Sequence, residues 1–182
     1  MVSHLNKNNS PTMVDVGDKN ITQRIAEAEG EVIFDKDSFK KIESLKSKKG
    51  SIKNIAILAG IMGSKETSRL IPLCHNIPID AVNIEINKNI KKNSMKVKAI
   101  VKTTSKTGVE MEALTAVSIS CLTIYDMCKS LDKRMKITDI SRIFMIIVSN
   151  KRTYCIVLQV ILCMILLFYD KGNKYYWSCE EG

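Results

Sequence analysis

Two segments of this chain concentrate side chains that can transfer protons. In the segment Ile71–His75 a histidine follows a proline turn, and an imidazole exchanges protons near neutral pH. The segment Lys106–Lys129 carries carboxylates near both ends and a lysine at its last position: Glu110, Glu112, Asp126 and Lys129. Acid–base groups beside turns and helix ends suit a phosphorylated substrate. The alternatives are a histidine that only hydrogen-bonds its own turn and a solvated ion pair between Asp126 and Lys129.

The second segment is expected to form one long helix, and this geometry constrains any shared site. An ideal helix places Glu112 and Asp126 about 40° apart in azimuth but ~21 Å apart along the axis. One small reacting group therefore cannot touch both side chains of the same helix. If both act on one substrate, the site is either extended or assembled from two chains, an arrangement that a symmetric oligomer provides.

A further cation precedes the second expected helix. Lys49 and Gly50 place an ammonium group and open backbone N–H groups where a helix N-terminus attracts phosphate. The sequence lacks the GxxxxGK[ST] spacing of a nucleotide-binding P-loop. A plain surface lysine is the alternative for Lys49.

Local sequence signals place these groups on helices and strands. A short strand is expected at residues 31–34, followed by a helix that Asp37 or Ser38 caps and that Gly50 ends. A second helix stops before Pro72. Its apolar residues at helical spacing are Ile52, Ile55, Ala59 and Met62.

Alternating apolar and polar residues predict a β-hairpin in the middle of the chain. Residues 81–87 and 95–101 both alternate, and a link rich in lysine and asparagine joins them. The long helix that follows carries an apolar stripe made by Leu114, Val117, Cys121, Ile124, Cys128 and Leu131. Helices thus have an antiparallel sheet to cover, which predicts an α+β layer architecture.

The composition indicates one globular domain. The 182 residues are 45% hydrophobic and 26% charged, which allows a sizeable core. The formal charge of +9 favours anionic partners, but lysine is abundant throughout, so a general compositional bias explains this charge better. Aromatic residues do not alternate with basic ones before residue 150, so sequence-specific nucleic-acid binding is disfavoured.

The six cysteines indicate a reducing compartment rather than a metal site. The sequence contains no CxxC pair and no zinc-type histidine spacing, and nothing near its start resembles a signal peptide. A cytoplasmic location is therefore expected. Cys121 and Cys128 lie two turns apart on one helical face and are expected as small buried residues.

The chain divides by composition into three stretches. Residues 1–12 are polar and predict a mobile N-terminal arm, and residues 13–142 form the expected domain. Residues 143–182 are an atypical apolar tail. Its apolar core has 16 residues, short of the ~20 that span a bilayer. A weak membrane segment, an additional buried strand or helix, and a translated frameshift are the alternatives for this tail.

Several short motifs together resemble the molybdenum cofactor biosynthesis protein C family, the cyclic pyranopterin monophosphate synthases. They lie within residues 3–140 and comprise Met13–Val16, Lys49–Gly50, Ala59–Ile61, Leu70–His75, Lys106–Thr115 and Leu122–Lys129. The resemblance implies a lyase that converts cyclised dihydro-GTP (3',8-cyclo-7,8-dihydroguanosine 5'-triphosphate) into cyclic pyranopterin monophosphate and pyrophosphate. This is an early step of molybdenum cofactor biosynthesis, and a radical-SAM cyclase supplies the substrate.

The same resemblance implies a ferredoxin-like subunit, a homohexamer built as a trimer of dimers, and active sites at subunit interfaces. Matched by motif, the catalytic residues are Asp126, Lys129, Lys49 and His75. The substrate-binding residues are Leu73, Cys74, His75, Met111 and Glu112. No metal site or resident cofactor is implied, although magnesium can accompany the triphosphate.

One part of the chain departs from the family pattern. Family members continue with a glycine-rich KSGGKSG loop whose lysine belongs to the active site, whereas residues 143–150 read IFMIIVSN here. Without that loop the chain lacks a flexible backbone segment and one phosphate-binding charge. The alternative function is a catalytically impaired homologue that oligomerises or binds nucleotide and associates with a membrane through its tail.

Overall fold

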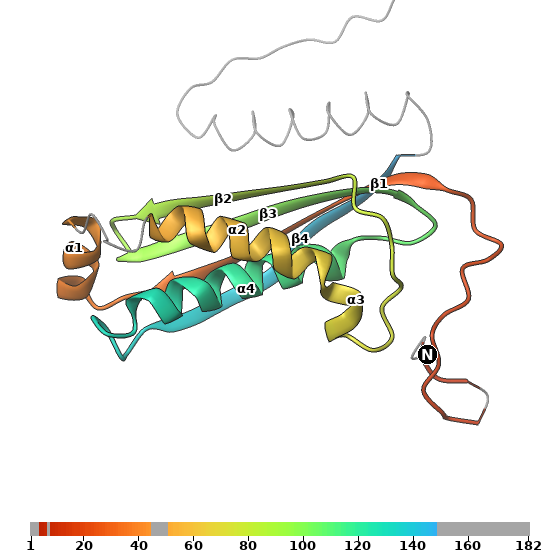
Figure 1. Cartoon of the computed structure of the whole chain (residues 1–182), viewed down its shortest axis with the longest axis horizontal. Helices are drawn as coiled ribbons and strands as arrows, with labels where there is room; N and C mark the ends of the chain where they lie inside the picture. Colours follow the sequence, from red (N-terminus) through yellow and green to blue (C-terminus); the bar gives the residue numbers. More distant parts are fainter. Residues whose placement is uncertain (1–3, 7, 45–50, 149–182) are drawn as a thin grey trace, which may run out of the picture. The chain divides into compact units, whose positions relative to one another are not determined.

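The computed structural model describes residues 4–6, 8–44 and 51–148, and the account below concerns these residues (Figure 1). Along this part of the chain the elements are β1 (Thr22–Ile33), α1 (Lys36–Ser44), α2 (Ile52–Lys65), α3 (Thr67–Leu70), β2 (Ala81–Asn89), β3 (Ser94–Ser105), α4 (Glu110–Cys128) and β4 (Lys136–Val148). The strands form an antiparallel sheet in the order β2-β3-β1-β4. This arrangement confirms the α+β prediction and the ferredoxin-like fold.

The predicted hairpin is present and is longer than the alternating segments. β2 pairs with β3 from Ala81 opposite Lys102 to Asn89 opposite Ser94. Every second side chain is buried on one face, as alternation predicts: Ile84, Ile86, Val97, Ala99 and Val101.

The first strand is the main correction to the sequence-based prediction. Residues 31–34 were expected to form a short strand, but β1 spans 12 residues and pairs with β3 from Thr22 to Ile33. Alanine, glutamate and glycine dominate this segment, and strands are depleted in them, so its local signal is weak. The small residues have a packing role, because a Cβ on Gly30 would lie 2.7 Å from Val117 Cγ1 of α4.

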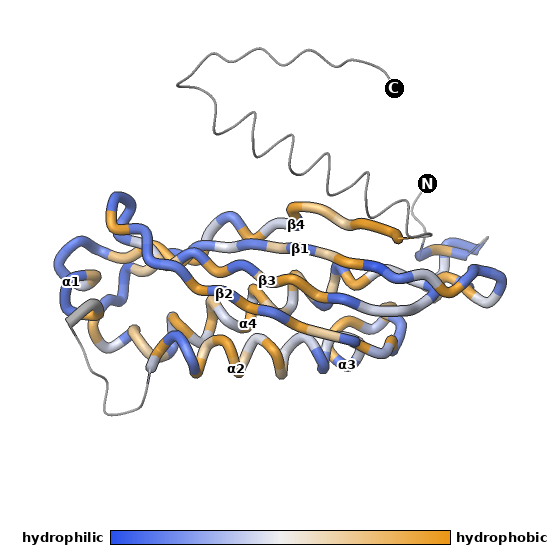
Figure 2. Tube along the Cα trace, turned by 90° about the horizontal axis from the view of Figure 1, so that it is seen from above, coloured by the Kyte–Doolittle hydropathy of each residue, from blue (hydrophilic) through white to orange (hydrophobic). Residues whose placement is uncertain are grey.

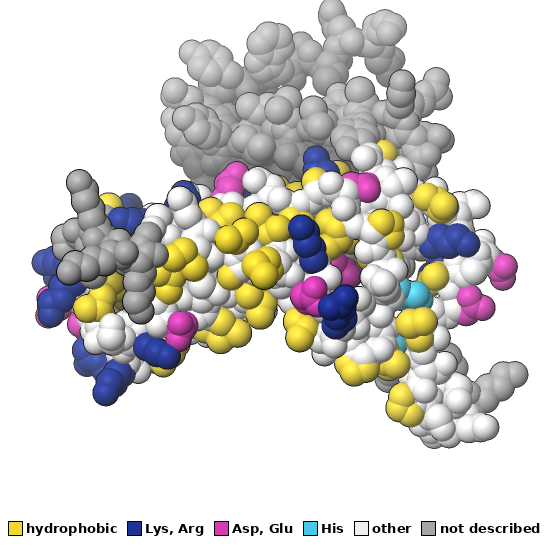
Figure 3. Space-filling view, in the orientation of Figure 1, with side chains coloured by type: hydrophobic (Ala, Val, Ile, Leu, Met, Phe, Trp, Pro, Cys, Tyr) yellow, Lys and Arg dark blue, Asp and Glu magenta, His cyan; other side chains and the backbone are white. Residues whose placement is uncertain are grey.

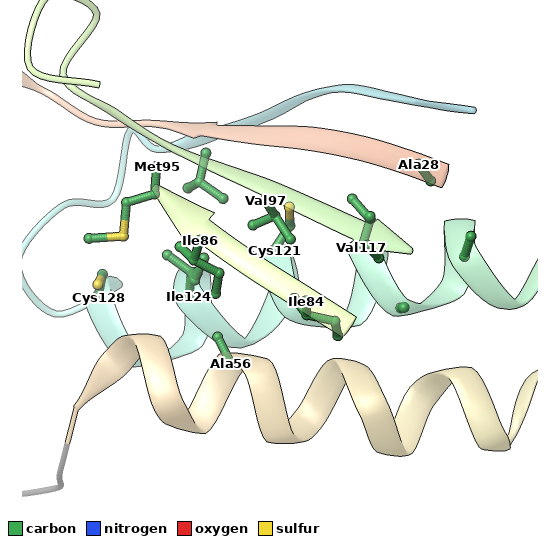
Figure 4. Close-up of a cluster of buried hydrophobic side chains, with 14 of the residues drawn as sticks. Ala28, Ala56, Ile84, Ile86, Met95, Val97, Val117, Cys121, Ile124 and Cys128 are labelled. Carbon is green, nitrogen blue, oxygen red and sulfur yellow. The ribbon is translucent and has the colours of Figure 1, made fainter. Parts of the chain in front are cut away.

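Helices α2 and α4 lie on the same face of the sheet (Figure 2). They approach closely at Gly60, where an added Cβ would lie 2.8 Å from the Ala116 carbonyl oxygen. At the same crossing Ser120 Oγ donates a 2.9 Å hydrogen bond to the Ala56 carbonyl oxygen. The core lies between these helices and the sheet, where Ala56, Ile84 and Ile124 meet (Figure 4).

Most of the predicted stripe of α4 forms this core. Val117, Cys121, Ile124 and Cys128 are fully buried, whereas Leu131 lies beyond the helix and is exposed. In the described part of the chain α4 alone is long and apolar enough to cross a membrane, and half of that stretch is buried against the protein. Its hydropathy is accounted for by this packing.

Burial also determines the protonation state of the two cysteines of α4. It raises the pKa of Cys121 to about 12, and it raises the pKa of Cys128 to about 11 with a smaller contribution from the Asp132 charge. Both thiols therefore stay protonated near neutral pH, as expected of small buried residues. Among the described residues, no group of three or more His, Cys, Asp or Glu side chains is placed to hold a metal ion.

The second predicted helix exposes several of its large apolar side chains, while Ile52, Ile57 and Ile61 are partly buried against the core. α2 ends at Lys65 and the short α3 follows, so helical structure does stop before Pro72. Its buried face consists of small residues: Ala56, Gly60, Gly63 and Ser64. The exposed fractions of Ile55, Leu58 and Met62 are 37%, 60% and 60%. The expected end of the preceding helix, at Gly50, lies outside the described residues.

Strand β4 runs through residue 142, where the apolar tail was expected to begin. Residues 143–148 continue the strand, and Ile143 and Ile147 remain exposed. The chain separates into two compact units, Met1–Ile147 and Val148–Gly182, and this description concerns the first. Residues 149–182 lie outside the described part, and with them the three alternatives for the tail.

Candidate active site

The loop that carries His75 is fastened to the end of β3. Cys74 N donates to the Ile71 carbonyl oxygen at 3.0 Å, which closes the turn after α3. Further along, Thr103 Oγ1 donates to the Pro78 carbonyl oxygen at 2.5 Å, and Asp80 N donates to the Lys102 carbonyl oxygen at 2.9 Å. These bonds hold the loop at both ends. The three matched residues between them, Leu73, Cys74 and His75, are half-buried.

His75 meets the N-terminal part of the chain. Its Nε2 lies 2.7 Å from the carbonyl oxygen of Val14, within the segment of residues 13–17 that we call the N-terminal strap. A carbonyl oxygen only accepts hydrogen bonds, so Nε2 carries a proton in this arrangement. In the neutral ring Nδ1 is then the acceptor, which leaves one nitrogen able to take a proton from a substrate.

The strap is itself held by a lysine directly after β3, and an arginine of β1 binds the backbone of that lysine. Lys106 Nζ donates to the Gly17 carbonyl oxygen at 2.5 Å, and Asp15 Oδ1 accepts from Gly17 N at 2.8 Å. Arg24 donates through its Nη2 to the Lys106 carbonyl oxygen at 3.0 Å. The sheet thereby fixes the strap, and the strap contacts His75.

The N-terminal end of α4 adds a buried carboxyl to this neighbourhood. The side chain of Glu112 lies in the first turn and is buried. Burial raises its pKa, a hydrogen bond from its own backbone N–H opposes this shift, and the charge of Glu110 raises it further. The pKa of Cys74 is raised by burial and by the Glu112 charge. Cys74 and Glu112 therefore lie within electrostatic reach, which places the two matched substrate-binding segments near one another.

The C-terminal end of α4 carries an exposed ion pair. Lys129 Nζ lies 2.7 Å from Asp126 Oδ1, with 62% and 71% of the two side chains exposed. The hydrogen bond with Asp126, and then the charge of Asp126, raise the pKa of Lys129. The pair provides an acid and a base within one turn, in full contact with solvent.

The predicted residues thus form two groups rather than one. Met111 and Glu112 lie at the N-terminal end of α4 and Glu112 influences Cys74 of the segment Leu73–His75, whereas Asp126 and Lys129 lie at the other end. The two groups are separated by ~21 Å along a single continuous helix, so one subunit does not bring them together. Lys49 lies outside the described residues.

The contacts of Val14, Arg24 and Lys106 were not predicted. Met13–Val16 was noted only as part of a motif, and a backbone carbonyl leaves no signal in the side-chain sequence. Arg24 was missed because β1 itself was not predicted to begin before residue 31. Their common role appears only when β1 and β3 are paired, with Thr22 opposite Ser105.

Comparison with known proteins places these groups within one family. Residues 13–144 match the MoaC family. A cyclic pyranopterin monophosphate synthase of Helicobacter hepaticus is 51% identical over 140 residues, which cover 77% of this chain and 88% of that protein. The synthases of Campylobacter jejuni and Campylobacter lari are 50% and 52% identical over 139 residues, with 76% of this chain and 88% of each relative covered.

The matched region contains both ends of α4, the loop of His75 and the N-terminal strap. It therefore covers each described residue that the motifs assigned to the site. The extent of the match and the identity to these relatives confirm the resemblance inferred from the motifs. This chain belongs to the MoaC family.

Proposed function

We propose that this protein is a cyclic pyranopterin monophosphate synthase. It acts as a lyase that converts cyclised dihydro-GTP into cyclic pyranopterin monophosphate and pyrophosphate in molybdenum cofactor biosynthesis. The observation that carries this proposal is the identity of about one half to synthases along 139–140 residues. That region includes His75, Glu112, Asp126 and Lys129.

The two groups of residues suit different parts of this reaction. Rearranging the purine ring and closing a cyclic phosphate require proton transfers, which Asp126, Lys129 and His75 can serve. Lys129 and Lys49 supply positive charge for the phosphates. Leu73, Cys74 and Met111 offer apolar contact beside His75. The raised pKa of Glu112 favours its protonated form, which can donate a hydrogen bond to the substrate.

A single subunit leaves these roles divided, so the proposal includes a homo-oligomer. A hexamer arranged as a trimer of dimers, with active sites between subunits, is the assembly implied by the family resemblance. The distance between the two ends of α4 supports a site shared by two copies. A symmetric pair would contain two such sites.

The proposal extends to the setting of the reaction. A radical-SAM cyclase supplies the nucleotide substrate, and both enzymes work in the cytoplasm. The reaction uses no resident cofactor, and magnesium enters with the triphosphate group. The absence of a resident metal is tested by dialysing the protein against a chelator and then assaying it with the magnesium complex of the substrate, where turnover should be unchanged.

The decisive experiment is a turnover assay with purified full-length protein and enzymatically prepared cyclised dihydro-GTP. Pyrophosphate and pterin product should appear together at equal molar rates. The competing candidate is the impaired homologue, which is favoured by one observation: residues 143–150 lack the glycine-rich lysine loop. A folded, oligomeric protein that releases neither product would support that candidate and contradict the synthase.

A further inference from the structure

A buried hydroxyl on α2 has no hydrogen-bond partner within the part of the chain that the structure describes. Ser64 is 1% exposed, and its Oγ neither donates nor accepts a hydrogen bond there. Other hydroxyls of the helical layer donate to backbone carbonyl oxygens, among them those of Thr67, Ser118, Ser120 and Thr123. A buried hydroxyl without a partner costs free energy, and such groups in native proteins often serve a chemical role.

The packing of α2 against α4 sets the neighbours of this hydroxyl. Ser120 Oγ donates to the Ala56 carbonyl oxygen at 2.9 Å, and a Cβ on Gly60 would lie 2.8 Å from the Ala116 carbonyl oxygen. A step of four residues forward on α2 thus matches a step of four residues back on α4, so the two helices run antiparallel. Residues four apart lie on one face of a helix. The next step therefore brings the last turn of α2 beside the first turn of α4.

Ser64 and Glu112 occupy these facing turns. Ser64 belongs to the buried face of α2, and Glu112 in the first turn of α4 is 5% exposed. The chain that follows α2 agrees with this placement, because the charge of Glu112 reaches Cys74. Apolar side chains gather along the outer surface of the helical layer, where they offer no hydrogen bond to either group (Figure 3).

We infer that Ser64 is a positioning residue for Glu112, and that its hydroxyl donates a hydrogen bond to the Glu112 carboxylate whenever this carboxyl is ionised. The inference deepens the proposed function, because the motifs assign Glu112 to the substrate. A carboxylate only accepts hydrogen bonds, and burial removes the water that would otherwise donate them. A serine hydroxyl can rotate toward the charged form and stabilise it.

Other titratable and charged groups also lie around the first turn of α4. Glu110 shares this turn, and its charge adds to burial in raising the pKa of Glu112. Arg24 of β1 donates to backbone carbonyl oxygens at the end of β3. The remaining groups belong to α2, α3 and the loop after α3: Lys65, Arg69, Cys74 and His75. Burial and Glu110 both oppose ionisation of Glu112, and the Ser64 hydroxyl offsets part of this opposition.

Direct titration of Glu112 tests the contact without using turnover. Its carboxyl carbon is followed by NMR in full-length protein labelled with ¹³C-glutamate, and Glu112→Gln assigns the signal. Ser64→Ala removes the donor, so the titration midpoint should rise by about one pH unit or more, as expected for a lost hydrogen bond to a charged group. Ser64→Cys keeps the size of the side chain and a weaker donor, so it should give a smaller rise.

Ser120→Ala is the matched control at the same pair of helices. Its hydroxyl already donates to the Ala56 carbonyl oxygen, so its melting temperature should fall while the Glu112 midpoint keeps the wild-type value. Ser64→Ala should behave differently. Below the midpoint its melting temperature should equal or exceed that of wild type, because an unpartnered hydroxyl is removed. Above the midpoint it should fall relative to wild type, because the carboxylate has lost its donor.

Turnover then connects the contact with the reaction. In the synthase assay, the limb of the kcat/KM profile that follows Glu112 should move in Ser64→Ala by the same interval as the NMR midpoint. An unchanged midpoint in Ser64→Ala and Ser64→Cys would contradict the contact, and a moved midpoint with a wild-type profile would contradict the positioning role. A moved midpoint in folded protein that releases neither pyrophosphate nor pterin would support the contact and contradict the synthase function.

Discussion

The two ends of α4 hold the same kinds of side chain in opposite surroundings. At its N-terminal end the Glu112 carboxyl is buried, with a raised pKa, beside the fixed loop of His75. At its C-terminal end the Asp126 carboxylate is 71% exposed and pairs with Lys129. One end is organised by burial within the fold of a single chain, and the other carries an exposed ion pair.

The electrostatic properties of the two ends therefore have different physical origins. A buried carboxyl has its protonation set by desolvation, which a single folded subunit already provides. An exposed ion pair lies in a medium of high dielectric constant, where its field is weak and screened by salt. Asp126 and Lys129 need further desolvation before their charges can act strongly on a phosphate. The predictions below separate these dependencies.

The largest effect is expected at the exposed end. Lys129→Ala should lower turnover by at least ~100-fold, because it removes both an acid–base group and a phosphate-binding charge. Its melting temperature should stay unchanged, since the ammonium group is exposed. Arg69→Ala is the matched control, because Arg69 and Glu66 also form an exposed ion pair three residues apart, at 3.2 Å. Equal turnover by Lys129→Ala and wild-type protein would remove Lys129 from the site.

A change at the crossing of the helices should affect both ends together. Gly60→Ala would force α2 away from Ala116 and Ser120, and overpacking of this kind costs about 1–3 kcal/mol. The free energy of unfolding in urea should fall by that amount, and KM and kcat should both worsen. Leu58→Ala, on the outer face of α2, should leave stability nearly unchanged. Wild-type stability of Gly60→Ala would show that the two helices do not approach so closely.

A smaller effect is expected from loosening the N-terminal strap. Lys106→Met removes the 2.5 Å hydrogen bond to Gly17, and one such bond corresponds to about 1 kcal/mol, or roughly 5-fold in KM. Amide exchange of residues 13–17 should become faster, while exchange in α4 should not change. Lys102→Met, an exposed lysine on β3, serves as the control. Unaltered exchange in the strap would mean that Lys106 does not hold it.

The smallest effect concerns the pH dependence of stability at the buried end. Because the folded pKa of Glu112 is raised, folding favours its protonated form. The stabilising contribution is thus present below the ordinary pKa near 4.5 and is lost as pH rises through the folded value. Glu112→Gln cannot ionise. Its free energy of unfolding should therefore improve relative to wild type as pH rises above 4.5. A pH-independent difference for Glu112→Gln would contradict the buried-carboxyl assignment.

Sequence patterns predicted the elements in which apolar residues recur at the spacing of one buried face. The hairpin of β2 and β3 and the stripe of α4 follow the two- and 3.6-residue periods of a single buried face. β1 was largely missed because its alanines and glycine fit under α4, and only the partner helix gives them a reason to be small. For the same reason the apolar residues of α2 at helical spacing were recognised without the information that Ile55 and Met62 are exposed.

The candidate site was predictable in its residues but not in its connections. Motifs identified His75, Glu112, Asp126 and Lys129, because residue type and order along the chain are read directly from the sequence. The contact between His75 and Val14 joins a side chain to a backbone carbonyl 61 positions away, and such a bond leaves no pattern. The influence of Glu112 on Cys74 likewise depends on tertiary packing, since helix and loop are distant in the chain.

Because α4 is one continuous helix, the number of residues in it sets the distance and the angle between the side chains at its two ends. Inserting one residue between Leu114 and Leu122 would turn Asp126 by about 100° and advance it by ~1.5 Å relative to Glu112. Substitutions along this stretch leave that spacing intact, whereas a single insertion or deletion destroys it. Selection on this part of the gene should therefore act on the number of codons more strictly than on most of the amino acids they specify.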